Sequence, residues 1–149
     1  RQMCIRDRLK MFEHILVPVD FSEKNQHALD VAVEVAALAN GTITLLHVIE
    51  IITDTTFAEF ETFYQQLEQR SQEKMAALIK SHQEGSINIE QRIVYGNRAQ
   101  EILNCADEFE IDLIIMSSHR IDEHNQTTGW GTISHKVGIL AQCPIMLVK

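Results

Sequence analysis

Apolar residues in this chain occur in two kinds of segment, short unbroken runs and longer stretches with helical periodicity. The run Leu113–Met116 shows no polar alternation, as expected of a strand that is covered on both faces of a parallel sheet. Strands that alternate with helices predict β-α-β units and an α/β fold. We expect an open five-stranded parallel sheet with four helices, its strands lying at 14–19, 42–48, 87–94, 112–117 and 144–148.

The first two helical stretches have recognisable ends. Ser22 is the expected N-cap of the first helix, which an Asn-Gly pair at 40–41 terminates. Its expected inward residues are Ala28, Val31, Ala32, Val35 and Leu38. A capping box at Thr56 and Glu59 opens the second helix, and Gly85 ends it. The expected inward residues of this helix are Phe60, Phe63, Tyr64, Leu67, Met75 and Leu78.

The last two helices follow turns that contain glycine. A turn at 96–97 precedes the third helix, with Ala99, Ile102, Leu103 and Ala106 facing inward. The fourth helix begins at Gly131-Thr132 and carries apolar residues at helical spacing, namely Ile133, Val137 and Leu140. The first N–H groups of a helix lack intrahelical partners, and ligands of parallel sheets bind beyond the carboxyl ends of the strands. The end of the fourth strand and the start of this helix therefore predict a phosphate site.

The first ten residues differ in composition from the rest of the chain. Four are basic and one is acidic, without a periodic pattern that would form an element. We expect residues 1–10 to be a non-native or disordered extension and residues 11–149 to form one domain. The formal net charge is −8, and residues 11–149 contain nine basic and twenty acidic side chains, a net charge of −11. Such a chain repels phosphate backbones, so we expect no nucleic acid partner.

Composition also argues against a membrane, disulfide or metal-dependent protein. No apolar run approaches the roughly 20 residues of a membrane-spanning helix, and no signal peptide is visible. The cysteines have unrelated spacings and predict neither disulfides nor a thiolate metal site; they are Cys4, Cys105 and Cys143. We therefore expect a cytoplasmic protein. No metal site is expected either, because no compact zinc motif is formed by His119, His124 and His135.

Five segments together match the pattern of one known family. They read His-Ile-Leu-Val-Pro-Val-Asp-Phe-Ser at 14–22, Leu-Leu-His-Val at 45–48, Gly-Asn-Arg-Ala-Gln-Glu-Ile at 96–102, Ser-Ser-His-Arg at 117–120 and Cys-Pro-Ile-Met-Leu-Val at 143–148. In this order they resemble the universal stress protein family over residues 11–149. The resemblance implies a Rossmann-like sheet with strand order 3-2-1-4-5, helices on both faces and a homodimer.

Nucleotide-binding members of that family carry a G-x2-G-x9-G-[ST] loop that wraps the phosphates of ATP. Here Ser117 and Arg120 replace the first two glycines, and ten residues rather than nine separate Arg120 from Gly131. Glycine permits positive φ and close backbone approach to phosphate, and both properties are weaker in this version of the loop. Some members resemble this chain, and in such a loop Arg120 would give phosphate a charge-assisted contact instead.

The resemblance implies an ATP site at the carboxyl ends of the first and fourth strands, with Mg²⁺ only as the counter-ion of the nucleotide. Asp20 would accept a hydrogen bond from a ribose hydroxyl or the base amine, and Val48 would line the base. The implied nucleotide-binding residues are Pro18, Val19, Asp20, Val48, Met116, Ser117, His119, Arg120, Gly131, Thr132 and Ile133.

Some of these residues also have ordinary structural explanations. Asp20 could cap the following helix, and Thr132 could simply begin the last one. Trp130 could cover the nucleotide or pack on the sheet. One largely aromatic series has core spacing, although part of it could form a dimer surface; it contains Phe57, Phe60, Phe63, Tyr64 and Leu67.

Two functions remain open from the sequence. The first is a stress-response regulatory protein that binds ATP or a related adenine nucleotide and acts as a dimeric sensor or adaptor. The second is a nucleotide-free dimeric interaction module of the same fold. In both, pairing is expected through the apolar strand at 144–148. We expect no enzyme and no catalytic residue, beyond slow ATP hydrolysis at most, because the nucleophile-elbow and Walker A signatures are missing.

Overall fold

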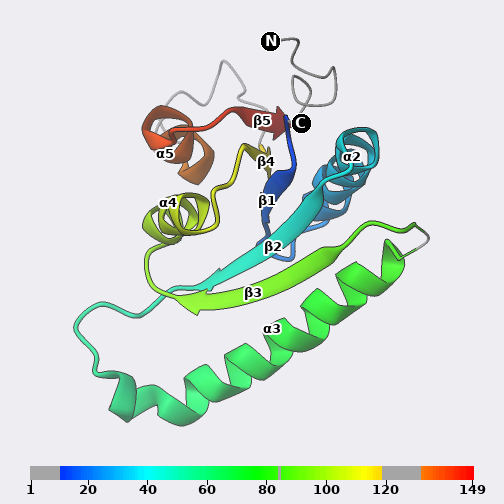
Figure 1. Cartoon of the computed structure of the whole chain (residues 1–149). Helices are drawn as coiled ribbons and strands as arrows, with labels where there is room; N and C mark the ends of the chain where they lie inside the picture. Colours follow the sequence, from blue (N-terminus) through cyan, green and yellow to red (C-terminus); the bar gives the residue numbers. More distant parts are fainter. Residues whose placement is uncertain (1–10, 84, 119–131) are drawn as a thin grey trace, which may run out of the picture.

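The structure is a computed structural model that describes residues 11–83, 85–118 and 132–149. The described residues form one parallel sheet in the order β3-β2-β1-β4-β5 (Figure 1). Its strands are β1 (His14–Pro18), β2 (Thr42–Ile49), β3 (Ile89–Tyr95), β4 (Leu113–Ser117) and β5 (Ile145–Val148). The α/β class and the strand order predicted from the sequence are confirmed, including the placement of β3 at an edge.

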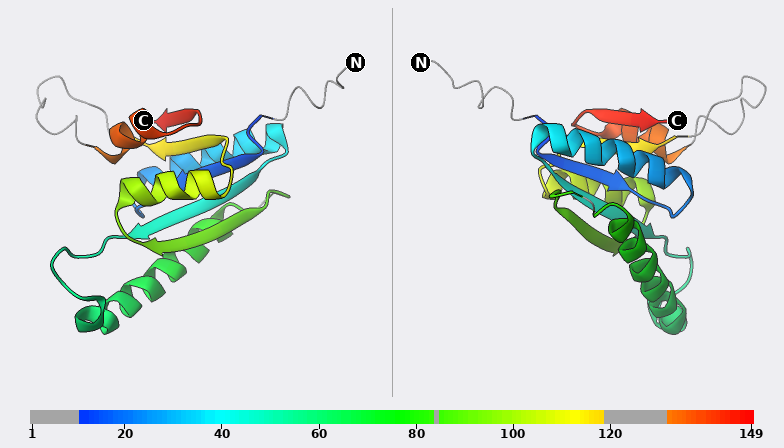
Figure 2. Two further views of the ribbon diagram at one scale, coloured as in Figure 1. Left: turned by 60° about the vertical axis from the view of Figure 1, so that its left-hand side comes forward. Right: turned by 90° about the vertical axis from the view of Figure 1, so that its right-hand side faces the viewer.

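Helices cover both faces of this sheet (Figures 1 and 2). Helices α2 (Lys24–Ala39) and α3 (Glu61–Ser81) pack on one face, with the short 3₁₀ helix η1 (Phe57–Phe60) before α3. Helices α4 (Arg98–Glu108) and α5 (Ile133–Leu140) pack on the other. Alternate side chains of each strand enter the two cores, so that Ile15 and Val17 face α2 and α3 while Leu16 faces α4 and α5.

Three expected boundaries of the first three helices are confirmed. Thr56 and Glu59 form the reciprocal capping box, with the Thr56 N–H donating to the Glu59 carboxylate over 3.3 Å, and the box opens η1 directly before α3. Asn40 ends α2 in the left-handed conformation at φ 54°. Between β3 and α4, Gly96 has φ 147°, which an L side chain rarely adopts, and Asn97 then caps α4 by accepting the Gln100 N–H over 3.1 Å.

Two other expected boundaries are wrong. Glu23, not Ser22, is the N-cap of α2, and its side chain makes no capping hydrogen bond. Ser22 is engaged differently, because its backbone N–H donates to the Asp20 carboxylate over 3.0 Å and its carbonyl accepts from the Asn25 N–H. Helix α3 ends at Ser81 rather than at Gly85.

Some apolar residues expected to face inward are exposed. Leu38 is 90% exposed, because it lies roughly a third of a turn around α2 from the line through Ala28, Ala32 and Ala36. On α5 Val137 is buried, whereas Leu140 is exposed. Phe60 and Phe63 are also exposed, and Tyr64 takes the buried position at this end of α3. Periodicity located the helices correctly but did not fix which apolar residues lie on the inner face.

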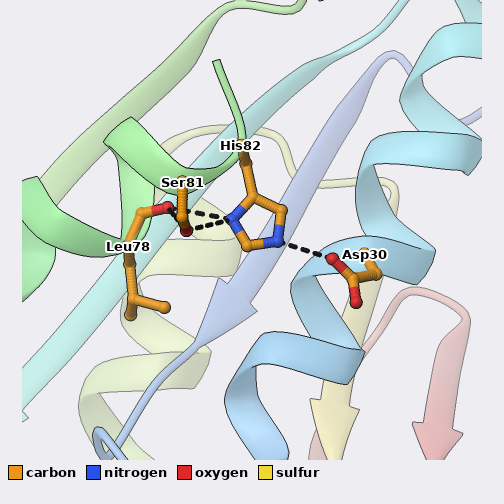
Figure 3. A network of polar contacts seen from close by, with 4 residues as sticks. All are labelled: Asp30, Leu78, Ser81 and His82. Carbon is orange, nitrogen blue, oxygen red and sulfur yellow. Dashed lines mark hydrogen bonds and ion pairs between the residues drawn. The ribbon is translucent and has the colours of Figure 1, made fainter. Parts of the chain in front are cut away.

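A histidine at the end of α3 ties this helix to α2 (Figure 3). His82 Nε2 lies 2.6 Å from Asp30 Oδ1, and His82 Nδ1 lies 2.9 Å from the carbonyl oxygen of Leu78. The Ser81 hydroxyl lies 2.8 Å from the same Nδ1 and donates to the Leu78 carbonyl. The imidazole is nearly buried, whereas the side chain of Asp30 is 60% exposed.

Replacing His82 by alanine should lower the free energy of unfolding by about 1–2 kcal/mol, since it removes a hydrogen bond between helices while water still reaches Asp30. Urea denaturation followed by circular dichroism measures this difference. Gln83→Ala, at the exposed neighbouring position, is the control and should change stability by less than about 0.5 kcal/mol. Equal losses in the two variants would contradict a role for the His82 contact.

Candidate functional site

A cavity of about 310 Å³ lies at the carboxyl ends of β1 and β4. At β1 the chain order in the sheet reverses, because β2 lies on one side of it and β4 on the other. Open α/β sheets bind ligands at such positions, and small-molecule sites start at roughly 300 Å³. The described lining residues are Pro18, Val19, Asp20, Ser22, Lys24, Asn25, Leu46, Val48, Arg98, Ile102, Met116, Ser117, Ser118, Thr132, Ile133 and Ser134.

The cavity brings together eight of the eleven residues named from the sequence. They are Pro18, Val19, Asp20, Val48, Met116, Ser117, Thr132 and Ile133. The other three, His119, Arg120 and Gly131, lie outside the described residues, as do His124 and Trp130. Residues far apart in the sequence thus border one space between β1, β2, β4 and the start of α5.

The tip of β1 is a strained turn. Phe21 has φ 63°, a left-handed conformation that costs a bulky residue on the order of 1–3 kcal/mol. The turn is held by the Asp20 carboxylate, which accepts the Ser22 N–H, and by the ring of Phe21, whose centroid lies 4.4 Å from that of His47. The ammonium of Lys74 lies 5.5 Å from the Phe21 ring centroid. Asp20 therefore caps this turn. It does not cap α2, although its position before that helix had suggested this alternative.

The carboxyl of Asp20 is poised to remain ionised. Partial burial by itself would raise its pKa, but the hydrogen bonds from Ser22 and the positive charge of Arg98 outweigh that effect and lower the pKa below its ordinary value of 3.8. An ionised carboxylate accepts hydrogen bonds and donates none. At the cavity wall, this group suits the hydroxyl or amino groups of a ligand.

Asn25 connects the two strand ends that border the cavity. Its side-chain oxygen accepts the Asp20 N–H over 2.9 Å, and its amide group donates to the Ser117 hydroxyl over 3.1 Å. The residue is only 1% exposed. Sequence reasoning did not identify it, although a polar residue on the same face of α2 as Ala28 and Ala32 was an available signal.

Two basic side chains also line the cavity, Lys24 at the start of α2 and Arg98 at the start of α4. Arg98 Nε lies 3.6 Å from the Glu50 carboxylate, and both side chains are about half exposed, so water screens this ion pair and makes it weak. Both cations were missed from the sequence. Arg98 stands in the segment 96–102 that carried the family resemblance, which could have pointed to it.

The histidine below the turn stays neutral. Burial lowers the pKa of His47, and the positive charge of Arg98 adds to this, while the hydrogen bond to the Val19 carbonyl opposes it. His47 Nδ1 lies 2.9 Å from that carbonyl oxygen, which can only accept, so Nδ1 carries the proton. His47 shares its face of β2 with Leu45, which packs against α2 and α3, and it contacts Phe21, so it supports the turn from the face opposite the cavity.

Hydroxyl groups and the start of α5 form the remaining wall. Thr132 caps α5, with its hydroxyl accepting the His135 N–H over 3.4 Å, so the expected helix start is confirmed. Ile133 and Ser134 begin the helix and line the cavity, where the first N–H groups of a helix favour anions. Ser118 receives a hydrogen bond of 3.4 Å from the Lys149 ammonium.

Metal clusters, reactive thiols and membrane-spanning helices are three other kinds of feature that would indicate a function in the described residues. Nowhere in residues 11–83, 85–118 and 132–149 do three or more His, Cys, Asp or Glu side chains gather closely enough to hold a metal ion. Burial raises the pKa of the Cys105 thiol to about 11 and also raises that of Cys143, which makes both poor nucleophiles at neutral pH. Among the described helices, none is long and apolar enough to cross a bilayer.

Comparison with known proteins identifies relatives over nearly the whole chain. The model of the universal stress protein family matches residues 11–149. Universal stress protein YxiE of Bacillus subtilis is 28% identical over 149 residues, which cover 93% of this chain and 100% of that protein. The solved structure of protein MJ0577 of Methanocaldococcus jannaschii superposes with a TM-score of 0.79 at 28% identity, covering 93% of this chain and 96% of that one.

A universal stress protein of Archaeoglobus fulgidus has been solved in complex with dAMP. It superposes with a TM-score of 0.61 at 18% identity, covering 93% of this chain and 99% of that one. At this identity the likeness concerns the fold alone.

Proposed function

This chain belongs to the universal stress protein family, and on that premise we propose that it is a small stress-response regulatory protein that binds ATP or a related adenine nucleotide. The binding site is the cavity at the carboxyl ends of β1 and β4. The observation that carries the proposal is that eight residues named from the sequence border this one cavity. The dAMP complex of the Archaeoglobus fulgidus relative supports it, since it is an example of an adenine nucleotide on this fold.

The chemistry of the walls suits the parts of such a nucleotide. Val48 and Met116 offer apolar surface to the base, and the ionised Asp20 offers an acceptor to a ribose hydroxyl or the base amine. The start of α5 and the hydroxyls of Ser117 and Thr132 suit phosphate oxygens. His119, Arg120 and Gly131 remain proposed phosphate contacts. Mg²⁺ would enter only as the counter-ion of the nucleotide.

We also propose that the protein acts as a dimeric, cytoplasmic sensor or adaptor and not as an enzyme. Slow ATP hydrolysis is compatible with this role, although no side chain is assigned as a base for the attacking water. The paired form is proposed to use residues 144–148, because Met146 and Leu147 leave apolar surface on the edge strand β5. Protein partners would then bind according to nucleotide occupancy.

Light scattering at micromolar concentration should give the mass of a dimer. Leu147→Glu should shift the mass to that of a monomer, because it places two charges in the proposed interface. Leu38→Glu is the control, since it adds the same charge at an exposed apolar position on α2 and should leave the dimer intact. A wild-type monomer, or a Leu147 variant that remains dimeric, would contradict pairing through β5.

The nucleotide content of the protein as isolated tests the proposed ligand. Adenine nucleotide should be released on denaturation, and ATP at about one hundred times its dissociation constant should stabilise the empty protein by about 2.7 kcal/mol. A protein that contains no nucleotide, and whose melting temperature does not change with millimolar ATP, would instead fit the nucleotide-free interaction module.

A further inference from the structure

A group of apolar side chains stands exposed between β2 and the first turn of α3. We call it the aromatic surface, and it consists of Ile51, Ile52, Phe57, Phe60 and Phe63. Each of these side chains is between 38% and 47% exposed. The three phenylalanines recur every third residue through η1 into α3, which brings Phe57 and Phe60 onto one side of the 3₁₀ turn. Exposed apolar side chains that occur together, rather than singly, indicate an interaction site.

The aromatic surface rests on an ordered support. The rings of Phe57 and Tyr64 are stacked with centroids 5.2 Å apart, and Tyr95 meets Phe57 edge-on at 5.6 Å. The buried Tyr64 hydroxyl accepts the Ile52 N–H over 2.9 Å, which holds the preceding loop against α3. Burial and the neighbouring Glu68 carboxylate raise the pKa of Tyr95 to about 12, so its hydroxyl keeps the proton that it donates to Glu68. Binding therefore needs little ordering of these backbone segments.

The segment that carries the aromatic surface is acidic along its length, although at its margin the Glu50 carboxylate lies 3.6 Å from Arg98. Residues 50–69 contain five acidic residues and no lysine, arginine or histidine. Glu59 and Glu61 are exposed on either side of Phe60, and Glu50 and Asp54 are exposed in the preceding loop. A second copy of the same surface would bring like charges together, and so would an anionic membrane or a nucleic acid. The partner that complements both the apolar and the acidic side chains is basic and amphipathic.

We propose that the aromatic surface binds a basic amphipathic helix of a partner protein. The apolar face of that helix packs against Phe57, Phe60 and Phe63, as amphipathic helices lay their apolar face on apolar surfaces of other proteins. Its lysine and arginine side chains face Glu59 and Glu61, and arginine can also stack on the exposed rings. This site is separate from the nucleotide cavity, whose described lining contains none of the five side chains of the aromatic surface.

The test uses a fluorescein-labelled helical peptide of leucine and lysine, about 18 residues long with one apolar face, and a matched leucine–glutamate peptide. Fluorescence anisotropy with the full chain should show saturable binding of the lysine peptide, weakened by salt, and no binding of the glutamate peptide. Phe60→Ser/Phe63→Ser should raise the dissociation constant for the lysine peptide at least about tenfold, because both side chains lose the area that they bury on binding. Glu61→Lys should raise it about threefold.

Two control variants share the chemistry of these changes but lie on α2. Leu38→Ser removes an exposed apolar side chain, and Glu34→Lys reverses an exposed acidic one. Both should leave the dissociation constant unchanged, and circular dichroism should show the same fold for every variant. Equal binding of the two peptides, or wild-type affinity in Phe60→Ser/Phe63→Ser, would overturn the proposal. The proposal would also be overturned if Phe60→Ser/Phe63→Ser still bound the lysine peptide but no longer self-associated. Loss of binding to phosphatidylserine vesicles, with peptide binding retained, would overturn it as well.

Discussion

Replacing Asn25 by alanine should lower the free energy of unfolding by about 2–4 kcal/mol, a large effect for a single polar residue. The change removes the buried side-chain amide that bridges Asp20 and Ser117. The Asp20 N–H loses its acceptor, and the Ser117 hydroxyl loses its donor. The two hydrogen bonds are partly buried and contribute about 0.5–1.5 kcal/mol each, and truncation of the buried Asn25 side chain adds the cost of a small void. Because the bridge also holds the ends of β1 and β4 together, the affinity for adenine nucleotide should fall with the stability.

Urea denaturation measures the loss of stability for Asn25→Ala, and the melting temperature with and without ATP measures the loss of affinity. Gln26→Ala is the matched control, because it truncates an exposed amide at the next position of α2. It should stay within about 0.5 kcal/mol of the wild type. If Asn25→Ala were as stable as this control, Asn25 would not hold the cavity together.

Replacing Asp20 by alanine should raise the dissociation constant for ATP by about 10–100-fold, because a hydrogen bond to an ionised acceptor contributes about 1.5–3 kcal/mol. Asp20→Asn should be milder, since the amide oxygen can still accept the Ser22 N–H that shapes the turn. The lowered pKa of Asp20 also sets how the stability of the fold depends on pH. The contribution of Asp20 to the free energy of unfolding is complete above the ordinary pKa of 3.8, and it is lost as the pH falls through the lower pKa of the folded state.

Equilibrium dialysis with labelled ATP measures the effect of Asp20→Ala. Glu23→Ala is the control, because this exposed carboxylate stands close by in the sequence and does not line the cavity. Dialysis with 2′-deoxy-ATP then distinguishes the ribose hydroxyl from the base amine as the donor to Asp20. If the wild type binds 2′-deoxy-ATP more weakly than ATP, and Asp20→Ala binds both equally, the carboxylate contacts the ribose. Equal affinities of the wild type and Asp20→Ala for ATP would remove Asp20 from the site.

The sheet was predictable from the sequence because short apolar runs, such as that at 113–116, alternate with longer stretches of helical periodicity. Pro18 ends β1, at a position where ladder hydrogen bonds stop and proline is tolerated. The helix faces were less predictable, because Leu38 and Phe63 satisfy helical spacing and yet are exposed. An apolar residue at the margin of a helix face has no periodic signal that separates burial from exposure.

The candidate site was predictable where residues follow a strand end directly. Asp20 and Ser117 belong to segments of the family pattern, and the structure brings both to the cavity. Asn25, Lys24 and Arg98 were not predicted, because their role depends on how α2 and α4 approach the sheet edge. The spacing of Asn25 with Ala28 and Ala32 indicates a polar residue on the inner face of α2, but spacing alone does not say which groups that residue contacts. The part of the loop at 119–131 lies outside the described residues.

Calorimetric titration of ATP into nucleotide-free protein is the most direct test of the central claim that the cavity between β1 and β4 binds an adenine nucleotide. We expect saturable heat with one nucleotide for each chain, and weaker binding by Asp20→Ala. An absence of saturable heat up to millimolar ATP, in protein whose circular dichroism shows the intact fold, would contradict it.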